Sequence, residues 1–342
     1  MAVETRGYTT TDGIDLNEIL YGTVLPVIDI YNAEEVLDIR AMLCSDHDES
    51  YVKFDSSGHW KFQKLGEGEK PQSKKKVWGK FQKDTEKFGL DIGYTFDWLM
   101  SEMSSSEEVV RLARKAVSRD RALQTAVILD EALTDDGGSA GGFYNGNFSA
   151  NENMQTPPTF GQNSFNANHN HYVASGSASL TLATITSMKE HIKQHGYKQM
   201  VWGLCNADMI KKIEDLAAWS TTSNVPNPII DKVAVDGFAG RMLGIDWKET
   251  EWMPDDYLFI IGTGGDDAGK PLRYIQKKNP SAKGLILTPG SYDSRYPIID
   301  ADYLHWLEAL VVARGAGIIY QLTTGSYSSP DLLTNVVDAE TR

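Results

Sequence analysis

The longest periodic pattern in the chain predicts a helix over residues 106–133. Ser105 followed by Glu108 is typical of a capping box, in which the two side chains bind free backbone N–H groups of the first turn. At 1.5 Å per residue this helix would be about 40 Å long. The apolar residues that recur on one of its faces are Val109, Leu112, Ala113, Ala116, Val117, Leu123, Ala126 and Val127.

Alternating apolar and polar positions predict a long β-hairpin over residues 51–94. Trp60 and Phe62 alternate with polar residues on the first arm, residues 77–82 alternate on the second, and 66–75 form a Gly-, Glu- and Pro-containing tip. Arms of about 12–15 residues would reach roughly 40–50 Å. Because a two-stranded ribbon of that length is marginal in water by itself, we expect the hairpin to lie on another surface.

The rest of the pattern divides the chain into five predicted segments. They are an N-terminal arm (1–50), the extended hairpin (51–95), a segment with the long helix (96–179), a mixed α/β lobe (180–301) and a C-terminal segment (302–342). In the arm, a helix is predicted over 34–43 with Asn32 as its N-cap. The stretch 134–176 holds 7 Gly and 8 Asn, yet aromatic residues recur in it, which favours an ordered long loop over a linker.

The mixed lobe is predicted to combine two helices with several strands. Ile185, Met188 and Ile192 lie on one face of a helix that ends near Gly196, and Asn206 would cap a second helix. The predicted strands are 199–205, 233–238, 241–252, 257–262 and 284–290, and two apolar segments, 303–313 and 317–322, close the chain. The fold class predicted from these elements is α+β.

Charge is distributed unevenly along the chain. In total, 33 Lys and Arg against 47 Asp and Glu give a formal net charge of −14, which argues against a protein whose main task is to bind phosphate backbones. Residues 1–51 carry −9, residues 52–87 carry +5 and the remainder carries −10. These segments are either ordinary solvated surfaces or surfaces of opposite charge that meet between subunits. The face of the long helix that carries Arg111, Arg114, Lys115 and Arg119 allows the same two interpretations.

One segment resembles a phosphate-binding loop in its letters alone. Gly264–Pro271 satisfies the spacing G-x-x-x-x-G-K but places Pro271 where Mg²⁺ needs a Ser or Thr hydroxyl. Asp266 and Asp267 would also put negative charge where phosphates must lie. We therefore interpret the segment as a surface turn.

Two histidine pairs have spacings that place both imidazoles on one face. His169 and His171 would do so in an extended segment, and His191 and His195 on a helix. Neither pair has an evident third ligand, and no Glu follows His191 as in a zinc-protease helix. Polar surface or loop hydrogen bonding is the preferred interpretation of each pair, with a shared metal ion as the alternative. No catalytic site and no cofactor are predicted.

The two cysteines and the hydropathy exclude several other classes. Cys44 and Cys205 have no CxxC partner and are predicted to be small buried residues in a reducing compartment. The N-terminus has no apolar signal-peptide region, and no stretch approaches the roughly 18 apolar residues of a membrane span. We therefore expect neither a secreted nor a membrane protein.

The order of these segments resembles that of the major capsid proteins of tailed bacteriophages, a fold shared with encapsulin shells. On this resemblance, 51–94 corresponds to the extended loop, 106–133 to the spine helix of the peripheral domain, and 180–301 to the axial domain. Trp247–Gly262 is similar to a strand–turn–strand found late in that domain, and 303–322 would return to the peripheral domain.

The resemblance implies a non-enzymatic virion shell protein that assembles as hexamers and pentamers into an icosahedral head. Implied partners are other copies of itself, a portal, a separate scaffolding protein and decoration proteins, with packaged DNA contacted only non-specifically and no membrane. The candidate contacts between subunits are Lys61, Lys64, Lys70, Lys74, Lys75, Lys76, Asp46, Asp48, Glu49, Arg111 and Arg114. An encapsulin-type compartment and a soluble α/β enzyme that binds metal or nucleotide are the alternatives.

Overall fold

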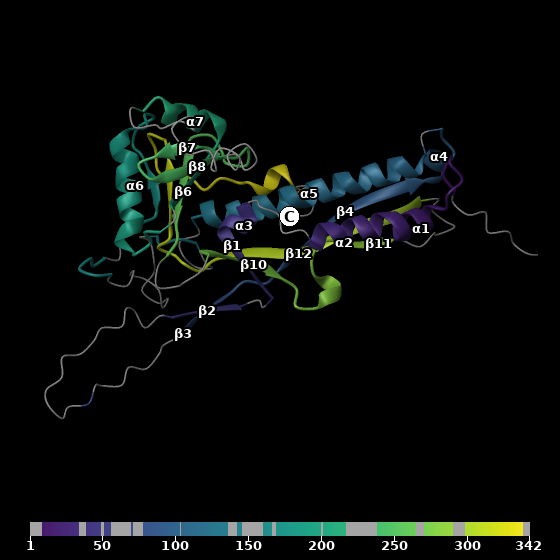
Figure 1. Cartoon of the computed structure of the whole chain (residues 1–342), viewed down its shortest axis with the longest axis horizontal. Coiled ribbons are helices and arrows are strands. Elements are labelled where there is room, and N and C mark those ends of the chain that lie inside the picture. The colour runs from purple at the N-terminus through teal and green to yellow at the C-terminus, as the bar shows by residue number, and fades with distance from the viewer. Residues whose placement is uncertain are drawn as a thin grey trace, which may run out of the picture.

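One long helix, α5 (Ser106–Leu133), lies along the first of two mixed β-sheets in the computed structural model, and the second sheet lies beyond one end of this helix (Figure 1). The structure describes residues 9–33, 39–48, 51–55, 70, 78–102, 104–135, 142–145, 160–165, 169–199, 201–216, 238–264, 270–289 and 298–337. None of its helices within these ranges is long and apolar enough to cross a membrane. The α+β class predicted from the sequence is confirmed.

Helix α5 begins and ends where its pattern predicts. The Ser105 hydroxyl accepts a hydrogen bond from the Glu108 backbone N–H (3.2 Å), which is half of the expected capping box. The other half is absent, because the Glu108 carboxylate accepts from the Arg111 guanidinium at 2.6 and 2.7 Å. Asp12 takes its place at the helix start, accepting from the Ser106 backbone N–H (3.1 Å) and hydroxyl. The helix N-terminus is therefore capped from the N-terminal arm.

The five-stranded sheet is organised around one long strand, β12 (Ile298–Val311). Along β12, β4 (Glu86–Thr95) pairs antiparallel with residues 298–307, and β11 (Ile286–Pro289) and β10 (Leu272–Gln276) pair antiparallel with residues 301–304 and 307–311. Strand β1 (Cys44–His47) adds to β10 in parallel. Helix α5 packs on β12, so sheet and helix bury each other's apolar faces.

The six-stranded sheet forms the other lobe, in the order β5-β13-β9-β6-β8-β7. Its strands are β5 (Tyr172–Ala174), β6 (Val201–Cys205), β7 (Phe238–Met242), β8 (Ile245–Glu249), β9 (Tyr257–Gly262) and β13 (Gly317–Gln321). Helices α6 (Leu182–Gln194) and α7 (Ala207–Glu214) pack against this sheet (Figure 1). Asn206 caps α7 as predicted, accepting from the Met209 N–H at 3.0 Å. Gly203 of β6 lies directly against the ring of buried Trp247, where no side chain would fit.

Sheet membership cuts across the predicted segments. Strands β10 and β11 fall inside the predicted axial segment 180–301, yet both pair in the five-stranded sheet, and β4 joins that sheet from the predicted hairpin segment. The predicted strand–turn–strand over Trp247–Gly262 contains β8 and β9, but β6 lies between them. The division into five segments thus remains a prediction, and the two sheets are the units that the structure describes.

The N-terminal arm is more helical than the sequence pattern indicates. Helix α1 (Leu16–Ile19), a π-helical turn (Leu20–Val24) and α2 (Leu25–Ala33) form a continuous helical run alongside α5 (Figure 1). A further helix, α3 (Ile39–Leu43), leads into β1, and residues 34–38 lie outside the described ranges.

The prediction that Asn32 caps a following helix is wrong. Asn32 lies within α2, and its amide group donates to the Leu285 carbonyl (2.8 Å) and accepts from the Leu285 N–H (3.0 Å). It thereby attaches α2 to the segment that enters β11. The capping signal was local, whereas the actual partner is 253 residues away in the sequence.

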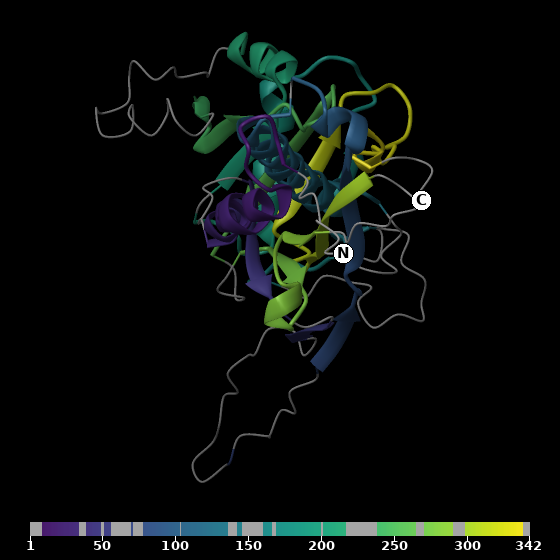
Figure 2. The same ribbon diagram turned by 90° about the vertical axis from the view of Figure 1, so that its right-hand side faces the viewer.

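The predicted hairpin is present at its base. Strands β2 (Tyr51–Asp55) and β3 (Trp78–Gln82) pair antiparallel, with Tyr51 opposite Gln82 and Asp55 opposite Trp78. They form a two-stranded sheet separate from the two main sheets, below them in both views (Figure 1, Figure 2). Between β2 and β3, only Lys70 belongs to the described residues, so the predicted tip and arm length remain predictions.

Three groups of buried side chains hold these elements together. The N-terminal helices, the first half of α5 and strands β4, β11 and β12 share one cluster, and α6, α7 and the six-stranded sheet share another. A third cluster joins the two lobes, because Leu129 of α5 packs in it together with Leu307 of β12 and Phe259 of β9. Cys44 and Cys205 are both buried and neither is part of a disulfide, as predicted.

Two further expectations concern loops. Within 134–176, the described residues include buried Phe143 and buried Tyr172, which agrees with an ordered loop at these positions. After Gly264, residues 265–269 lie outside the described ranges, and strand β10 begins at Leu272. A phosphate-binding loop leads into a helix, so the strand at this position agrees with a surface turn.

Candidate functional site

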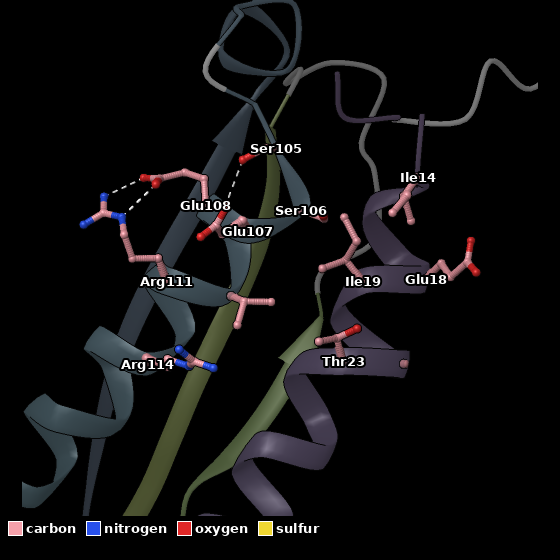
Figure 3. Close-up of a pocket in the computed structure, with 12 residues that line it drawn as sticks. Ile14, Glu18, Ile19, Thr23, Ser105, Ser106, Glu107, Glu108, Arg111 and Arg114 are labelled. Atoms are coloured by element: carbon pink, nitrogen blue, oxygen red, sulfur yellow. Dashed lines mark hydrogen bonds and ion pairs between the residues drawn. The ribbon is translucent and has the colours of Figure 1, made fainter. Parts of the chain in front are cut away.

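The candidate contact residues Arg111 and Arg114 lie at a surface groove of about 800 Å³ (Figure 3). The groove runs between the start of α5 and the α1 helical run, from which Ile19 and Thr23 contribute to the lining. Arg111 is ion-paired with Glu108 on the same helix, whereas Arg114 is exposed and forms no ion pair with any residue that the structure describes. The groove is at the end of the molecule opposite the six-stranded sheet (Figure 1).

Two of the acidic candidates, Asp46 and Asp48, are paired within the subunit. Asp46 of β1 forms an ion pair with Arg40 of α3 (2.9 Å), and Asp48, just after β1, forms one with Lys283 (2.9 Å); both carboxylates are exposed. Exposed pairs of this kind contribute about 0–1 kcal/mol, so exchanging them for contacts with a neighbour costs little. They therefore remain candidates for contacts between subunits.

The lysine candidates come from the segment that the sequence predicts to be the hairpin. Lys70 is exposed. The other lysine candidates and one of the three acidic candidates lie outside the described residues: Lys61, Lys64, Lys74, Lys75, Lys76 and Glu49. Their roles remain predictions.

Replacing Asp12 by alanine should loosen the arm from the start of α5. Ser106 and Thr10 hydroxyl groups donate to the Asp12 carboxylate and lower its pKa to about 2. Since this folded-state pKa is below the unfolded value of about 3.9, the contact stabilises the arm above about pH 4 and is lost as the pH falls towards 2. Amide hydrogen exchange at Thr11, which donates to the Ser104 carbonyl, should become several-fold faster. Exchange unchanged from that of a control, Glu18→Ala, would contradict this role.

The hairpin joins the body through Lys83, the residue that follows β3. Its ammonium group lies 2.8 Å from a carboxylate oxygen of Glu131 on α5 and 3.0 Å from one of Glu308 on β12. Burial alone would lower the pKa of Lys83, but the two carboxylates outweigh it and raise the pKa. Burial raises the pKa of Glu308 in spite of Lys83. One cation therefore compensates two largely buried carboxylates at the base of the hairpin.

A buried carboxylate on α5 organises a second polar group. Asp120 is 6% exposed, and its oxygens lie 2.7 Å from His305 Nδ1 and accept from the Tyr31 hydroxyl at 2.6 Å and the Gln124 amide at 2.8 Å. Burial alone would raise the pKa of Asp120, but these hydrogen bonds outweigh it and lower the pKa. Gln124 also accepts from Arg40 at 3.0 Å. The network connects the N-terminal arm, the long helix and β12.

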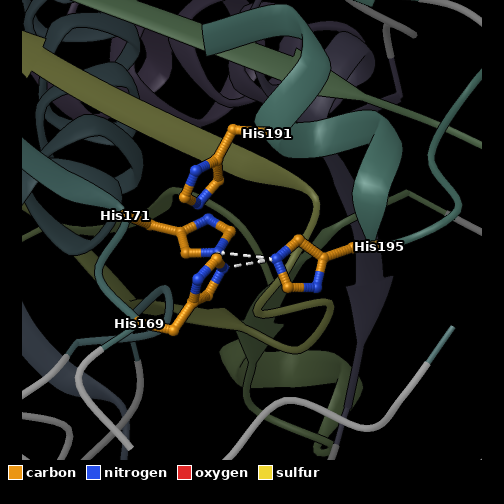
Figure 4. Close-up of side chains that lie close together, drawn as sticks. All are labelled: His169, His171, His191 and His195. Atoms are coloured by element: carbon orange, nitrogen blue, oxygen red, sulfur yellow. Dashed lines mark hydrogen bonds between the residues drawn. The ribbon is translucent and has the colours of Figure 1, made fainter. Parts of the chain in front are cut away.

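The two predicted histidine pairs meet in one cluster (Figure 4). His169 and His171 lie just before strand β5, which begins at Tyr172. His191 is in the last turn of α6, and His195 is its C-cap. Nε2 of His169 lies 2.7 Å from Nε2 of His195, and Nε2 of His171 lies 3.1 Å from each of them. One ring nitrogen of each of the four residues lies within 4.8 Å of the others.

Burial keeps the histidines of this cluster neutral near pH 7. It lowers the pKa of His191 to about 4 and that of His195 to about 3, with the charges of neighbouring histidines adding to the effect. The pKa of fully buried His171 is also well below its ordinary value, because of burial and then its three neighbours. Neutral imidazoles offer lone pairs, which is the form that binds metal ions.

Each histidine pair was predicted from its spacing, but the spacings did not predict that the two pairs meet. The signal was two same-face pairs with spacings i, i+2 and i, i+4 in one chain. Bringing them together requires β5 to lie beside β13, near the end of α6, which no local pattern indicates.

Solved structures share this architecture. No family model matches the chain, and no curated protein matches it significantly. A chain of Mycobacterium phage Patience is similar, with a TM-score of 0.67 and 21% identity over 95% of this chain and 94% of that one. The capsid of a native GTA particle has a TM-score of 0.52 and 11% identity, covering 85% and 92% of the two chains. The mature capsid of bacteriophage PhiM1 has a TM-score of 0.50 and 10% identity, covering 85% and 88%.

These likenesses define the fold. The two mixed sheets, the long helix packed on the five-stranded one and the separate hairpin form an architecture that is also found in capsid chains. More narrowly, the chain has the fold of the major capsid proteins of tailed bacteriophages, as the order of its segments predicted.

Proposed function

We propose that this chain is the major shell subunit of a tailed double-stranded DNA bacteriophage. Copies of it would assemble as hexamers and pentamers into the icosahedral head that encloses the genome. The observation that carries the proposal is the fold, which extends over nearly the whole chain and matches shell subunits rather than an enzyme scaffold. In this proposal the chain has a structural and not a catalytic role, and its location is the virion.

The base of the hairpin gives the proposal a physical basis. Strands β2 and β3 pair only with each other among the described strands. A two-stranded ribbon is marginally stable by itself, so a surface of an adjacent subunit that covers it would supply the missing burial. Lys83, held by Glu131 and Glu308, fixes the direction in which the ribbon leaves the body.

The charged segments of the chain give the proposed shell function a second physical basis. A basic hairpin segment of +5 and an acidic N-terminal segment of −9 belong to the same chain, so neighbouring copies can place them against each other. Each exposed ion pair contributes only about 0–1 kcal/mol, so register depends on many weak contacts in parallel. Weak repeated contacts also allow subunits to correct errors before the shell closes. We propose Arg111, Arg114 and the lysines of the hairpin for this role.

The proposed partners follow from the same assembly. A closed head requires a portal for DNA entry, and we infer a separate scaffolding protein and, where the outer surface offers a site, decoration proteins. The net charge of −14 keeps contacts with packaged DNA weak and non-specific.

Electron microscopy of the full chain, expressed alone and with its neighbouring genes, tests the proposal. We expect closed shells or hexameric and pentameric capsomers. A chain that stays monomeric under both conditions would overturn it. Shells that enclose an enzyme instead of DNA would favour the encapsulin-type compartment.

Replacing Lys74, Lys75 and Lys76 together by glutamate should reduce shell yield at least about tenfold, because six units of charge change at the hairpin. The matched control is the triple arginine variant, which retains the charge and should assemble normally. Both variants should keep the far-UV circular dichroism and unfolding midpoint of the wild type. Normal shells from the glutamate variant would remove the electrostatic part of the proposal.

A further inference from the structure

We propose that His169, His171, His191 and His195 form a structural binding site for a divalent transition-metal ion, with Zn²⁺ as the preferred occupant. Two segments of the chain bring one ring nitrogen of each of the four imidazoles to within 4.8 Å of the others (Figure 4). The proposal concerns the lobe with the six-stranded sheet and does not depend on shell assembly.

The contacts among the ring nitrogens cannot all be hydrogen bonds. Nε2 atoms of His169, His171 and His195 form a triangle with sides of 2.7, 3.1 and 3.1 Å. Each of these nitrogens either carries a proton or offers a lone pair, so with three atoms and two states at least one side joins two like groups. Two lone pairs, or two N–H groups, at such distances repel each other. A cation at the centre would accept all the lone pairs and remove the conflict.

His171 and His191 show that the ring nitrogens are available. The His171 ring is 0% exposed, and its Nδ1 lies 2.5 Å from the Gly317 carbonyl oxygen, which can only accept. The proton of neutral His171 is therefore on Nδ1, and Nε2 presents its lone pair to the cluster. A carbonyl that orients a histidine in this way is typical of metal ligands. His191 Nε2 is buried and has no hydrogen-bond partner among the residues that the structure describes.

The surrounding side chains hold the rings in place. The Phe165 ring stacks on His195 with centroids 4.2 Å apart and planes 12° apart, and Tyr144 stacks on the same ring at 5.8 Å. His169 and His191 stack on each other at 4.4 Å and 9°. The packing orients the His195 ring before an ion binds. An imidazole lone pair lies in the plane of its ring, so the stacked rings of His169 and His191 cannot both face one ion, and one of them has to rotate when the ion binds.

The ligand set points to the class of ion and to its role. Four neutral imidazoles suit Zn²⁺, Cu²⁺ or Ni²⁺ rather than Mg²⁺ or Ca²⁺, which prefer oxygen. A tetrahedral Zn²⁺ with bonds of about 2.0–2.1 Å holds its ligand nitrogens about 3.3 Å apart, a few tenths of an ångström beyond the sides of the triangle. Four protein ligands leave no open position, which is typical of a structural site. The ion would tie the segment before β5 to the end of α6.

Metal analysis of the full-length chain, purified without a histidine tag, tests the site. After incubation with Zn²⁺ and removal of free ion by dialysis, we expect about one zinc per chain and a thermal midpoint raised by about 5 °C. Co²⁺ in the same site should give the intense visible absorption of a tetrahedral complex. No retained zinc together with an unchanged midpoint would overturn the proposal. Weak six-coordinate Co²⁺ absorption would do the same.

Variants separate a built site from non-specific binding. His169→Ala, at the half-buried ligand, should weaken zinc binding at least about 100-fold, and His191→Ala should do the same. His47→Ala removes a histidine of β1 outside the cluster and should bind zinc like the wild type. Equal zinc binding by all three variants would contradict the assignment. Since zinc content is measured on unassembled chains, this outcome is independent of whether shells form.

Discussion

Replacing Asp120 by alanine should lower the free energy of unfolding by about 3–5 kcal/mol. The substitution removes the acceptor shared by the Tyr31 hydroxyl, the Gln124 amide and His305 Nδ1, all at buried positions. Each buried donor left without a partner costs about 1–3 kcal/mol, and the lost contacts connect three separate elements of the fold. Urea denaturation of the unassembled chain, followed by tryptophan fluorescence, measures the change.

Two companion variants isolate the cause. Arg119→Ala changes the preceding, exposed residue of the same helix and should shift stability by no more than about 0.5 kcal/mol. Asp120→Asn retains an acceptor oxygen without the charge and should fall between alanine and wild type. If Asp120→Ala were as stable as Arg119→Ala, the network would not hold the N-terminal arm on the long helix.

The same carboxylate predicts a dependence on pH. The pKa of Asp120 is lowered in the folded state, below the unfolded value of about 3.9. A depressed carboxyl pKa contributes stability above the unfolded pKa and loses it as the pH falls through the folded one. Wild-type stability should therefore drop below about pH 4, and the drop should be smaller for Asp120→Asn.

Local sequence patterns predicted the helices and strands of this fold better than they predicted which residues contact each other across it. Helix α5 could be predicted from its own residues, because the apolar periodicity and the Ser105 cap both depend on residues only a few positions apart in the sequence. Asp120 breaks that stripe and was not predicted to be buried, since its partners Tyr31 and His305 come from distant segments. In the same way, Asn32 has the residue type of a helix cap but binds Leu285, which is brought beside it by the sheet.

For the candidate sites too, the sequence predicted local groupings of residues but not their contacts with distant segments. The alternation of apolar and polar residues predicted the hairpin, whose short paired base the structure contains, but did not indicate that Lys83 anchors it between two carboxylates. The histidine pairs were visible as spacings, and their meeting depends on how α6 ends beside β13. Sequence spacing therefore identifies groups that share a face, whereas tertiary packing decides which faces meet.

Replacing Lys83 by methionine should lower the free energy of unfolding by about 2–4 kcal/mol at pH 8. Methionine retains the apolar stem but leaves Glu131 and Glu308, with side chains 10% and 9% exposed, without their shared cation. Lys87→Met is the matched control on β4, because exposed Lys87 lies over the Trp306 ring at 5.4 Å, a contact that contributes about 0.5–1 kcal/mol.

The pH dependence identifies the carboxylates as the cause of this loss. The pKa of Glu308 is already raised by burial, and removal of Lys83 should raise it further. Above the unfolded carboxyl pKa of about 4.3, the folded variant then holds more protons than the unfolded chain, so its stability falls as the pH rises. The difference from wild type should therefore be smaller at pH 5 than at pH 8. An equal difference at both pH values would show that lost packing, and not charge, destabilises the variant.

A double substitution extends the test to the hairpin. Adding Glu308→Gln to Lys83→Met removes one of the two carboxylate charges that Lys83 contacts and should recover part of the lost stability, which a double-mutant cycle measures as coupling. Because Lys83 follows β3 directly, the single variant also frees the hairpin base from α5 and β12. Under the proposed function, Lys83→Met should lower shell yield at temperatures where the subunit is still folded, and Lys87→Met should not. Full yield from folded Lys83→Met would mean that the direction of the hairpin is set without this anchor.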